Sequence, residues 1–98
     1  MNDKKLDITV MTITYNEEVN LPHLLSNVAD WATEVVILDS GSTDKTLNIA
    51  DSAGCRVYHR KFDNFSNQRK HLLNDIVVNT GWIIVLDADE VLTEELKV

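Results

Sequence analysis

The sequence predicts an α/β domain built on a parallel sheet, and three observations support that prediction. Stretches typical of strands alternate with amphipathic stretches along the chain, in the order β-α-β-α-β-α-β. Two of the strand-like stretches, at 35–38 and 82–86, are apolar without interruption, as strands are when both faces of a sheet are covered. Polar residues follow three of these stretches directly. We therefore expect right-handed crossovers, helices on both faces and a Rossmann-like sheet.

The strand-like stretches are rich in β-branched and large apolar residues, and the helical stretches repeat apolar residues three and four positions apart. The expected strands are 8–14, 35–38, 56–58 and 82–86, and the expected helices are 20–31, 44–53 and 66–77, with a further helix beginning near Thr93.

The expected helix ends have recognisable signals. Pro22 falls in the first turn of the first helix, where its missing N–H costs little. Thr43 or Asp44 is expected to cap the second helix, and Gly54 to end it. In the third helix, four apolar residues are expected to face inward: Leu72, Leu73, Ile76 and Val77.

Length and composition limit the class of protein. The chain has 98 residues, of which 44% are apolar and 26% charged, so we expect one small globular domain. The sequence has no long apolar run, and we expect no signal peptide. The single Cys55 is expected to be a small buried side chain and fits a reducing compartment, so we expect a cytoplasmic protein. The net charge of −7 argues against nucleic acid as the main partner. The basic segment 56–70 suits a small anionic ligand, or is an ordinary solvated surface.

The polar stretches that follow the strands predict a site. Ligands of parallel α/β sheets bind beyond the carboxyl ends of the strands, near the switch in strand order. Three such ends are polar here: 14–17 (Thr-Tyr-Asn-Glu), 39–44 (Asp-Ser-Gly-Ser-Thr-Asp) and 87–90 (Asp-Ala-Asp-Glu). We expect them to converge on one edge of the sheet.

The stretch 87–90 indicates a divalent cation. Its three carboxylates repel one another, and Mg²⁺ or Mn²⁺ would offset that repulsion. Alternatively, Asp89 or Glu90 caps the helix that follows. In 39–44, Asp39 either accepts backbone N–H groups in a tight turn, with Gly41 at positive φ, or holds the polar edge of a base or ribose; the two interpretations are compatible.

Two further side chains are candidates for ligand contacts. Tyr15 is expected at the sheet edge, where its ring can stack on a base. Arg69 interrupts an apolar stripe in the third helix, so its side chain either reaches toward the sheet edge and an anion, or pairs with Asp63 or Asp75.

Four motifs in order carry a family resemblance: TITYNEEVNLPHLL, VVILDSGSTDKTLNIA, FSNQRKHLLN and WIIVLDADEVL. Together they resemble the N-terminal half of family-2 glycosyltransferases, which have a glycosyltransferase-A fold and use nucleotide-sugar donors. The variant LDSGSTD, with LDADE, is most similar to the branch that adds glucose to the lipopolysaccharide inner core of bacteria. The resemblance covers residues 8–96.

The resemblance also implies roles for individual residues. Thr14 and Tyr15 match positions that hold the nucleobase, Arg69 matches an arginine that contacts the nucleotide, and Asp39 matches the first acidic position of the second loop. The next position, where many members have an aspartate that binds the base, is Ser40. The last pair, Asp87 and Asp89, matches the Asp-x-Asp motif that holds the ribose and the metal.

The implied reaction inverts the anomeric carbon: a carboxylate base deprotonates the acceptor hydroxyl, and the metal stabilises the departing diphosphate. That base lies downstream of the Asp-x-Asp motif in the family. We therefore expect residues 1–98 to be the nucleotide-sugar-binding part of a longer enzyme, inactive alone, able to self-associate and associated peripherally with the membrane. Two alternatives stay open: a sugar-nucleotide nucleotidyltransferase, and a non-catalytic receiver-like module with a phosphoacceptor aspartate.

Overall fold

The computed structural model describes residues 6–87 and has the predicted element order. Its strands and helices are β1 (Leu6–Thr14), α1 (Leu21–Val28), β2 (Ala32–Asp39), α2 (Thr46–Ser52), β3 (Arg56–His59), α3 (Phe65–Asp75) and β4 (Trp82–Asp87). Each expected element of this range is present, with ends that differ by up to three residues. The helix expected near Thr93 lies outside the described residues.

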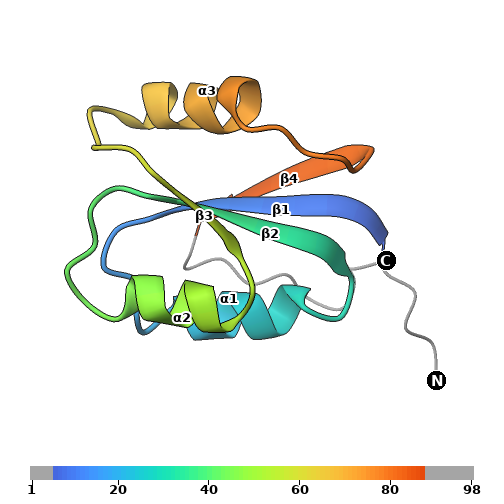
Figure 1. Ribbon diagram of the computed structural model, residues 1–98, viewed down its shortest axis with the longest axis horizontal. Helices are drawn as coiled ribbons and strands as arrows, with labels where there is room; N and C mark the ends of the chain where they lie inside the picture. Colours follow the sequence, from blue (N-terminus) through green and yellow to red (C-terminus); the bar gives the residue numbers. More distant parts are fainter. Residues whose placement is uncertain (1–5, 88–98) are drawn as a thin grey trace.

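The four strands form one parallel sheet in the order β3-β2-β1-β4. Helices α1 and α2 cover one face and α3 covers the other (Figure 1). The strand order changes direction at β1, since β2 and β3 are added on one side of it and β4 on the other. Thr14 is paired with Asp39 of β2, and Ile13 with Asp87 of β4, so the three predicted polar strand ends do begin at one edge.

The two faces bury two apolar clusters. The cluster under α1 and α2 contains Val10, Leu21, Leu24, Val28, Trp31, Ala32, Ile37, Ala50 and Leu86. The cluster under α3 is smaller, with Met11, Val36, Leu38, Leu72 and Ile76. Residues 10 and 11, and 36 to 38, alternate between the two clusters, as the period of a strand requires. Both faces of β1 and β2 are therefore buried, which explains the uninterrupted apolar sequence of 35–38 in β2; in β1, buried threonines such as Thr9 and Thr12 stand between the apolar residues.

The ends of the first two helices differ from the prediction. Helix α1 ends at Val28 rather than at residue 31, although Trp31 is buried beyond the helix and its indole N–H donates to the Asn27 carbonyl at 3.1 Å. Helix α2 has Lys45 as its N-cap, so the expected cap at Thr43 or Asp44 is wrong. The Asp44 carboxylate still accepts the Thr46 N–H at 2.9 Å, although Asp44 lies one residue before the N-cap. The C-terminal signal is confirmed, because Gly54 follows α2 with a φ of +77°.

Helix α3 buries a narrower stripe than predicted. Leu72 and Ile76 are buried, but Leu73 is 48% exposed and Val77 75% exposed. The helix ends at Asp75 and Ile76 is already extended, so helical spacing no longer places Val77 inward. The inward position one turn before Leu72 is Gln68, which is fully buried. An amide therefore occupies the stripe that the sequence pattern assigned to apolar residues and Arg69.

Two smaller expectations concern Cys55 and membrane spans. Cys55 is a half-buried thiol packed against the α1–α2 cluster, and burial raises its pKa to about 11, which suits a structural role. None of the helices in residues 6–87 has the length and apolar character needed to span a membrane.

Candidate functional site

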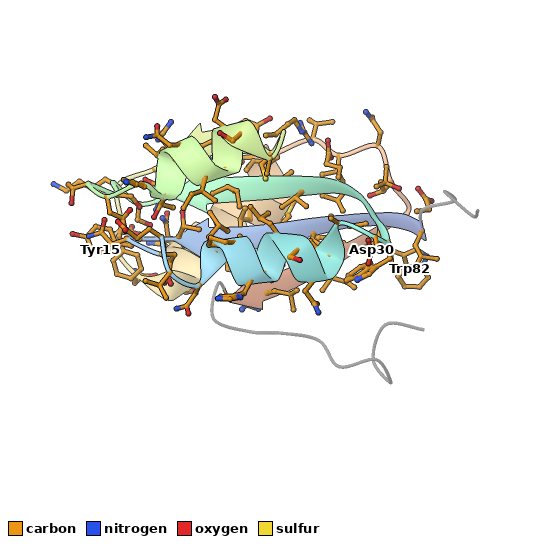
Figure 2. The ribbon with its side chains drawn as sticks, turned by 90° about the horizontal axis from the view of Figure 1, so that it is seen from below. Tyr15, Asp30 and Trp82 are labelled. Atoms are coloured by element: carbon orange, nitrogen blue, oxygen red, sulfur yellow. The ribbon has the colours of Figure 1, made fainter. Side chains whose placement is uncertain are left out.

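A cavity of about 380 Å³ lies at the carboxyl end of β1. It is lined by Ile13, Thr14, Tyr15, Glu17, Ser40 and Phe62. Figure 2 shows Tyr15 at one end of the molecule and Trp82, which begins β4, at the opposite end. The cavity therefore occupies the edge at which the sequence predicted a ligand.

The lining combines two aromatic rings with a few polar groups. Tyr15 is 57% exposed and Phe62 is 42% exposed, so both rings are accessible. Glu17 and Ser40 supply a carboxylate and a hydroxyl, whereas the hydroxyl of Thr14 is buried and donates to Asp39. Aromatic surfaces with a small number of polar groups suit a flat, polar-edged ring such as a nucleobase.

Asp39, which precedes Ser40 in the chain and is paired with Thr14, is fully buried behind these lining residues. Its Oδ1 accepts hydrogen bonds from the hydroxyls of Thr14 at 2.7 Å and Ser42 at 2.6 Å. Its Oδ2 accepts from the backbone N–H groups of Gly41 at 2.9 Å and Ser42 at 2.7 Å. Burial opposes the charge of this carboxylate, but these hydrogen bonds outweigh burial and lower its pKa.

The tight-turn interpretation of Asp39 is thus confirmed. Gly41 has the expected positive φ, at +108°. The four hydrogen bonds fill the usual acceptor directions of the carboxylate, so it rigidifies the turn from Ser40 to Ser42. A ligand contact by Asp39 itself remains a prediction.

The loop after β1 is hydrogen-bonded to the loop after β2, mainly through Asn16. Its Oδ1 accepts the Thr43 N–H at 2.8 Å and the Asp44 N–H at 3.3 Å, and its own N–H donates to Ser42 Oγ at 2.9 Å. Asn16 has a φ of +52°, a left-handed conformation that asparagine tolerates better than most residues. Glu17 N–H adds a bond to Thr46 Oγ1 at 2.8 Å. These contacts hold Tyr15 and Glu17 next to Ser40.

Sequence reasoning missed the roles of Asn16 and Gln68. Gln68 Nε2 donates to Ser40 Oγ at 2.9 Å and to the Arg60 carbonyl at 3.1 Å, while its Oε1 accepts from Arg60 Nη1 at 2.6 Å. Gln68 thereby links α3 to the loops after β2 and β3. The available signal was the polar residue at 68, four positions before Leu72 on the inward face of the helix.

Arg69, the candidate for a nucleotide contact on α3, does not line the cavity. Arg69 is exposed on α3 and is not among the described residues that line the cavity. Its proposed partners have others, since Asp63 pairs with Arg60 at 2.9 Å and Asp75 with His71 at 2.8 Å. The expectation that Arg69 interrupts the buried stripe is wrong, because Gln68 holds that position.

The metal prediction concerns Asp87 and Asp89. Asp87 ends β4 beside Ile13, so its backbone lies at the edge that carries the cavity. Asp89 lies outside the described residues. Within residues 6–87, no group of three or more histidine, cysteine or acidic side chains is placed to hold a metal.

A parallel α/β sheet with a ring-sized, partly aromatic cavity beyond its strand ends is the architecture of Rossmann-like domains. The chain belongs to glycosyl transferase family 2, since the family model matches residues 9–97. Family membership confirms the resemblance at the level of the family. The particular lipopolysaccharide branch stays a prediction.

Comparison with individual proteins agrees with this assignment. An uncharacterized glycosyltransferase of Rickettsia bellii is 34% identical over 90 residues, covering 92% of this chain and 30% of the relative. The structure of TarS 1–349 from S. aureus in complex with UDP-GlcNAc is 25% identical, with a TM-score of 0.68, over 90% of this chain and 28% of that one.

A glucosyl-3-phosphoglycerate synthase from Mycobacterium tuberculosis, crystallised with Mn²⁺, UDP and glucosyl-3-phosphoglycerate, shares the fold. It is 23% identical, with a TM-score of 0.54, over 83% of this chain and 33% of that one. The predicted glycosyltransferase-A fold is thus confirmed. The chain spans 28 to 33% of the length of these three proteins.

Proposed function

We propose that the chain is the donor-binding part of an inverting, nucleotide-sugar-dependent glycosyltransferase. The observation that carries this proposal is the cavity at the switch in strand order, which places the rings of Tyr15 and Phe62 beside the polar groups of Thr14 and Ser40. Such a cavity accepts a nucleobase, with stacking on an aromatic ring and hydrogen bonds at the polar edge.

The donor we propose is a uridine diphosphate sugar similar to UDP-glucose. TarS, which shares the fold and is 25% identical over the matched region, was crystallised with UDP-GlcNAc. The volume of about 380 Å³ is sufficient for a pyrimidine ring and part of a ribose. As acceptor we propose a cell-envelope glycan such as the lipopolysaccharide core. With that acceptor, the enzyme would act at the inner face of the cytoplasmic membrane. Both proposals rest on the resemblance of LDSGSTD and LDADE alone.

A divalent cation fits the chemistry of the donor set. Asp87 and Asp89 would hold Mn²⁺ or Mg²⁺ through carboxylate oxygens, which are the ligands these hard cations prefer. The backbone position of Asp87, at the edge next to the cavity, is consistent with this role. When bound, the cation would stabilise negative charge on the departing diphosphate.

The structure disfavours the receiver-like alternative. Receiver domains have the strand order 2-1-3-4-5, whereas here β4 and not β3 lies beside β1. Asp39, the aspartate that ends β2, is buried and hydrogen-bonded to the chain on both oxygens, which leaves it inaccessible to a phosphoryl donor.

Titration calorimetry with UDP, in the presence and absence of Mn²⁺, tests the proposal. Tyr15→Ala is expected to weaken UDP binding by a factor of about 5 to 150, because base–aromatic stacking contributes ~1–3 kcal/mol. Asp89→Ala is expected to reduce the part of the affinity that depends on Mn²⁺.

Trp82→Ala is the matched control. Trp82 is an aromatic residue that is 71% exposed at the opposite end of the sheet (Figure 2), so its removal should leave UDP affinity unchanged. A folded wild-type chain that binds no UDP under either condition would contradict the proposed function.

A further inference from the structure

The amide of Gln68 is fully buried and has only one satisfactory orientation. Its Oε1 must face Arg60 Nη1, which can only donate, at 2.6 Å. Its Nε2 must face the Arg60 carbonyl, which can only accept, at 3.1 Å. The second hydrogen of Nε2 is then directed at Ser40 Oγ, at 2.9 Å. Both amide hydrogens are used, and Gln68 acts on Ser40 as a donor.

This contact determines what the Ser40 hydroxyl can do. A hydroxyl group has one hydrogen and two acceptor lone pairs. Because one lone pair accepts from Gln68, the hydrogen must point away from the amide. None of the side chains and backbone groups that the structure describes accepts this hydrogen, and Ser40 lines the cavity beside Thr14 and Tyr15. The hydroxyl hydrogen is therefore available to a group bound in the cavity.

We propose that Gln68 is a positioning residue that orients the Ser40 hydroxyl as a hydrogen-bond donor to the ring bound in the cavity. The ligand class that fits is a pyrimidine nucleotide whose ring presents its O2 carbonyl oxygen to Ser40. An aspartate at position 40 would be acceptor-only and would instead require a ring N–H. The inference rests on the proposed function, because it assumes that the cavity holds the base.

A second polar group of the cavity would bind a different part of the ring from the part that Ser40 binds. Glu17 lines the same cavity, and its carboxylate can only accept hydrogen bonds when ionised. A ring with both an N–H and a carbonyl, such as uracil, can satisfy the two groups together. A test of Ser40 must therefore distinguish a hydrogen bond that Ser40 donates to the ring from one that it accepts from the ring N–H. This requires two ligands, of which only one has a ring N–H.

Two probes achieve that separation when each is titrated into the wild-type chain and its variants. UDP has an N–H and two carbonyl oxygens on its ring. The 5′-diphosphate of pyrimidin-2-one riboside has acceptors only, at O2 and N3. If Ser40 donates to the ring, Ser40→Ala should weaken both probes by a similar factor of about three to ten, the value of one neutral hydrogen bond.

The role of Gln68 is tested by Gln68→Glu. The introduced carboxylate has no hydrogen to give, so the Ser40 hydroxyl turns to donate to it and is lost to the ligand. Both probes should weaken by about the same factor as in Ser40→Ala, and Ser40→Ala combined with Gln68→Glu should weaken them little further. Asn74→Asp makes the same amide-to-carboxylate change at an exposed position of α3 and should leave both affinities unchanged.

Several outcomes would overturn the inference. If Ser40→Ala weakens UDP alone, Ser40 does not donate to O2, the acceptor that the two rings share. If Gln68→Glu behaves as Asn74→Asp does, or if its effect adds fully to that of Ser40→Ala, Gln68 does not position Ser40. If Gln68→Glu loses its cooperative thermal transition, Gln68→Met replaces it, with a weakening of both probes again expected and unchanged affinities counting against the inference.

The inference and the proposed function fail in different ways. Wild-type protein that binds UDP, with no dependence on Ser40 or Gln68, overturns the inference and leaves the proposed function standing. Wild-type protein that is folded and binds neither probe overturns both.

Discussion

The two faces of the sheet are closed by different chemistry. On the α1–α2 face lies the larger of the two apolar clusters, from Val10 to Leu86, beside buried threonines such as Thr12 and Thr46. On the α3 face, a smaller apolar cluster around Leu72 gives way to the buried amide of Gln68, which is bonded to Ser40 and Arg60. Burial of apolar surface is non-directional, whereas a buried amide requires its partners in fixed places. The first face therefore supplies the larger apolar core, and the Gln68 amide of the second face adds to the Asp39 and Asn16 contacts that fix the geometry of the cavity edge.

The largest effect should come from breaking the apolar face. Leu24→Ala removes a fully buried side chain and should lower the free energy of unfolding by about 2–5 kcal/mol, since a cavity is left behind. Urea denaturation followed by circular dichroism measures this change. Leu73→Ala, at a position 48% exposed, is the control and should change stability by less than about 0.5 kcal/mol. Equal losses in the two variants would show that the assigned core is wrong.

An intermediate loss of stability is expected from a change at Asp39, at the carboxyl end of β2. Asp39→Asn should lower the free energy of unfolding by about 1–3 kcal/mol, because the amide nitrogen cannot accept the hydrogen bonds that one carboxylate oxygen accepts now. The comparison is made by urea denaturation at neutral pH. An unchanged midpoint would show that the Ser40–Ser42 turn does not depend on the carboxylate.

The pH dependence of stability gives a second measurement on Asp39. Its pKa is lowered from the ordinary value of 3.8, so the folded state binds the proton less readily than the unfolded state does. The resulting stabilisation is fully present above that value and is lost as the pH falls through the lowered pKa. The stability difference between wild type and Asp39→Asn should thus shrink on acidification below about pH 4. Asp44 and Asp63 also have lowered pKa values, so only the difference between the two proteins is informative.

The smallest effect should come from the buried amide on the α3 face. Gln68→Met keeps the volume but removes the donor to Ser40 and the Arg60 carbonyl, and should lower the free energy of unfolding by about 1 kcal/mol. A stabilised variant in the same urea assay would show that this face, too, gains from purely apolar packing. The contrast between the faces would then be wrong.

The sequence predicted much of the fold because the relevant signals are local. An uninterrupted apolar stretch such as 35–38 indicates a strand that is buried on both faces. The helical spacing of Leu21 and Leu24 indicates a helix that is buried on one face. The end of α3 was less predictable. Val77 continues the helical period, but the chain has already become extended at Ile76.

The candidate site was predicted in part. Thr14, Tyr15 and Ser40 lie around one cavity as expected, because parallel strand ends share an edge. Arg69 was given the position that belongs to Gln68, since a one-residue error in helix phase rotates a side chain by about 100°. Phe62 was not predicted, because it lies in the loop between β3 and α3, where no periodicity indicates which way a side chain points.

The sequence by itself determined the order of strands and helices, the family, and the placement of Asp39 and Asp87 at strand ends, since each depends on neighbours along the chain or on a motif. Only the tertiary structure decided that Asn16 binds the loop after β2 and that Gln68 binds Ser40. Residues 27 and 28 positions apart in the chain make these contacts. A hydrogen bond between such residues depends on distances and directions that the sheet and helix packing establish, and no local pattern encodes them.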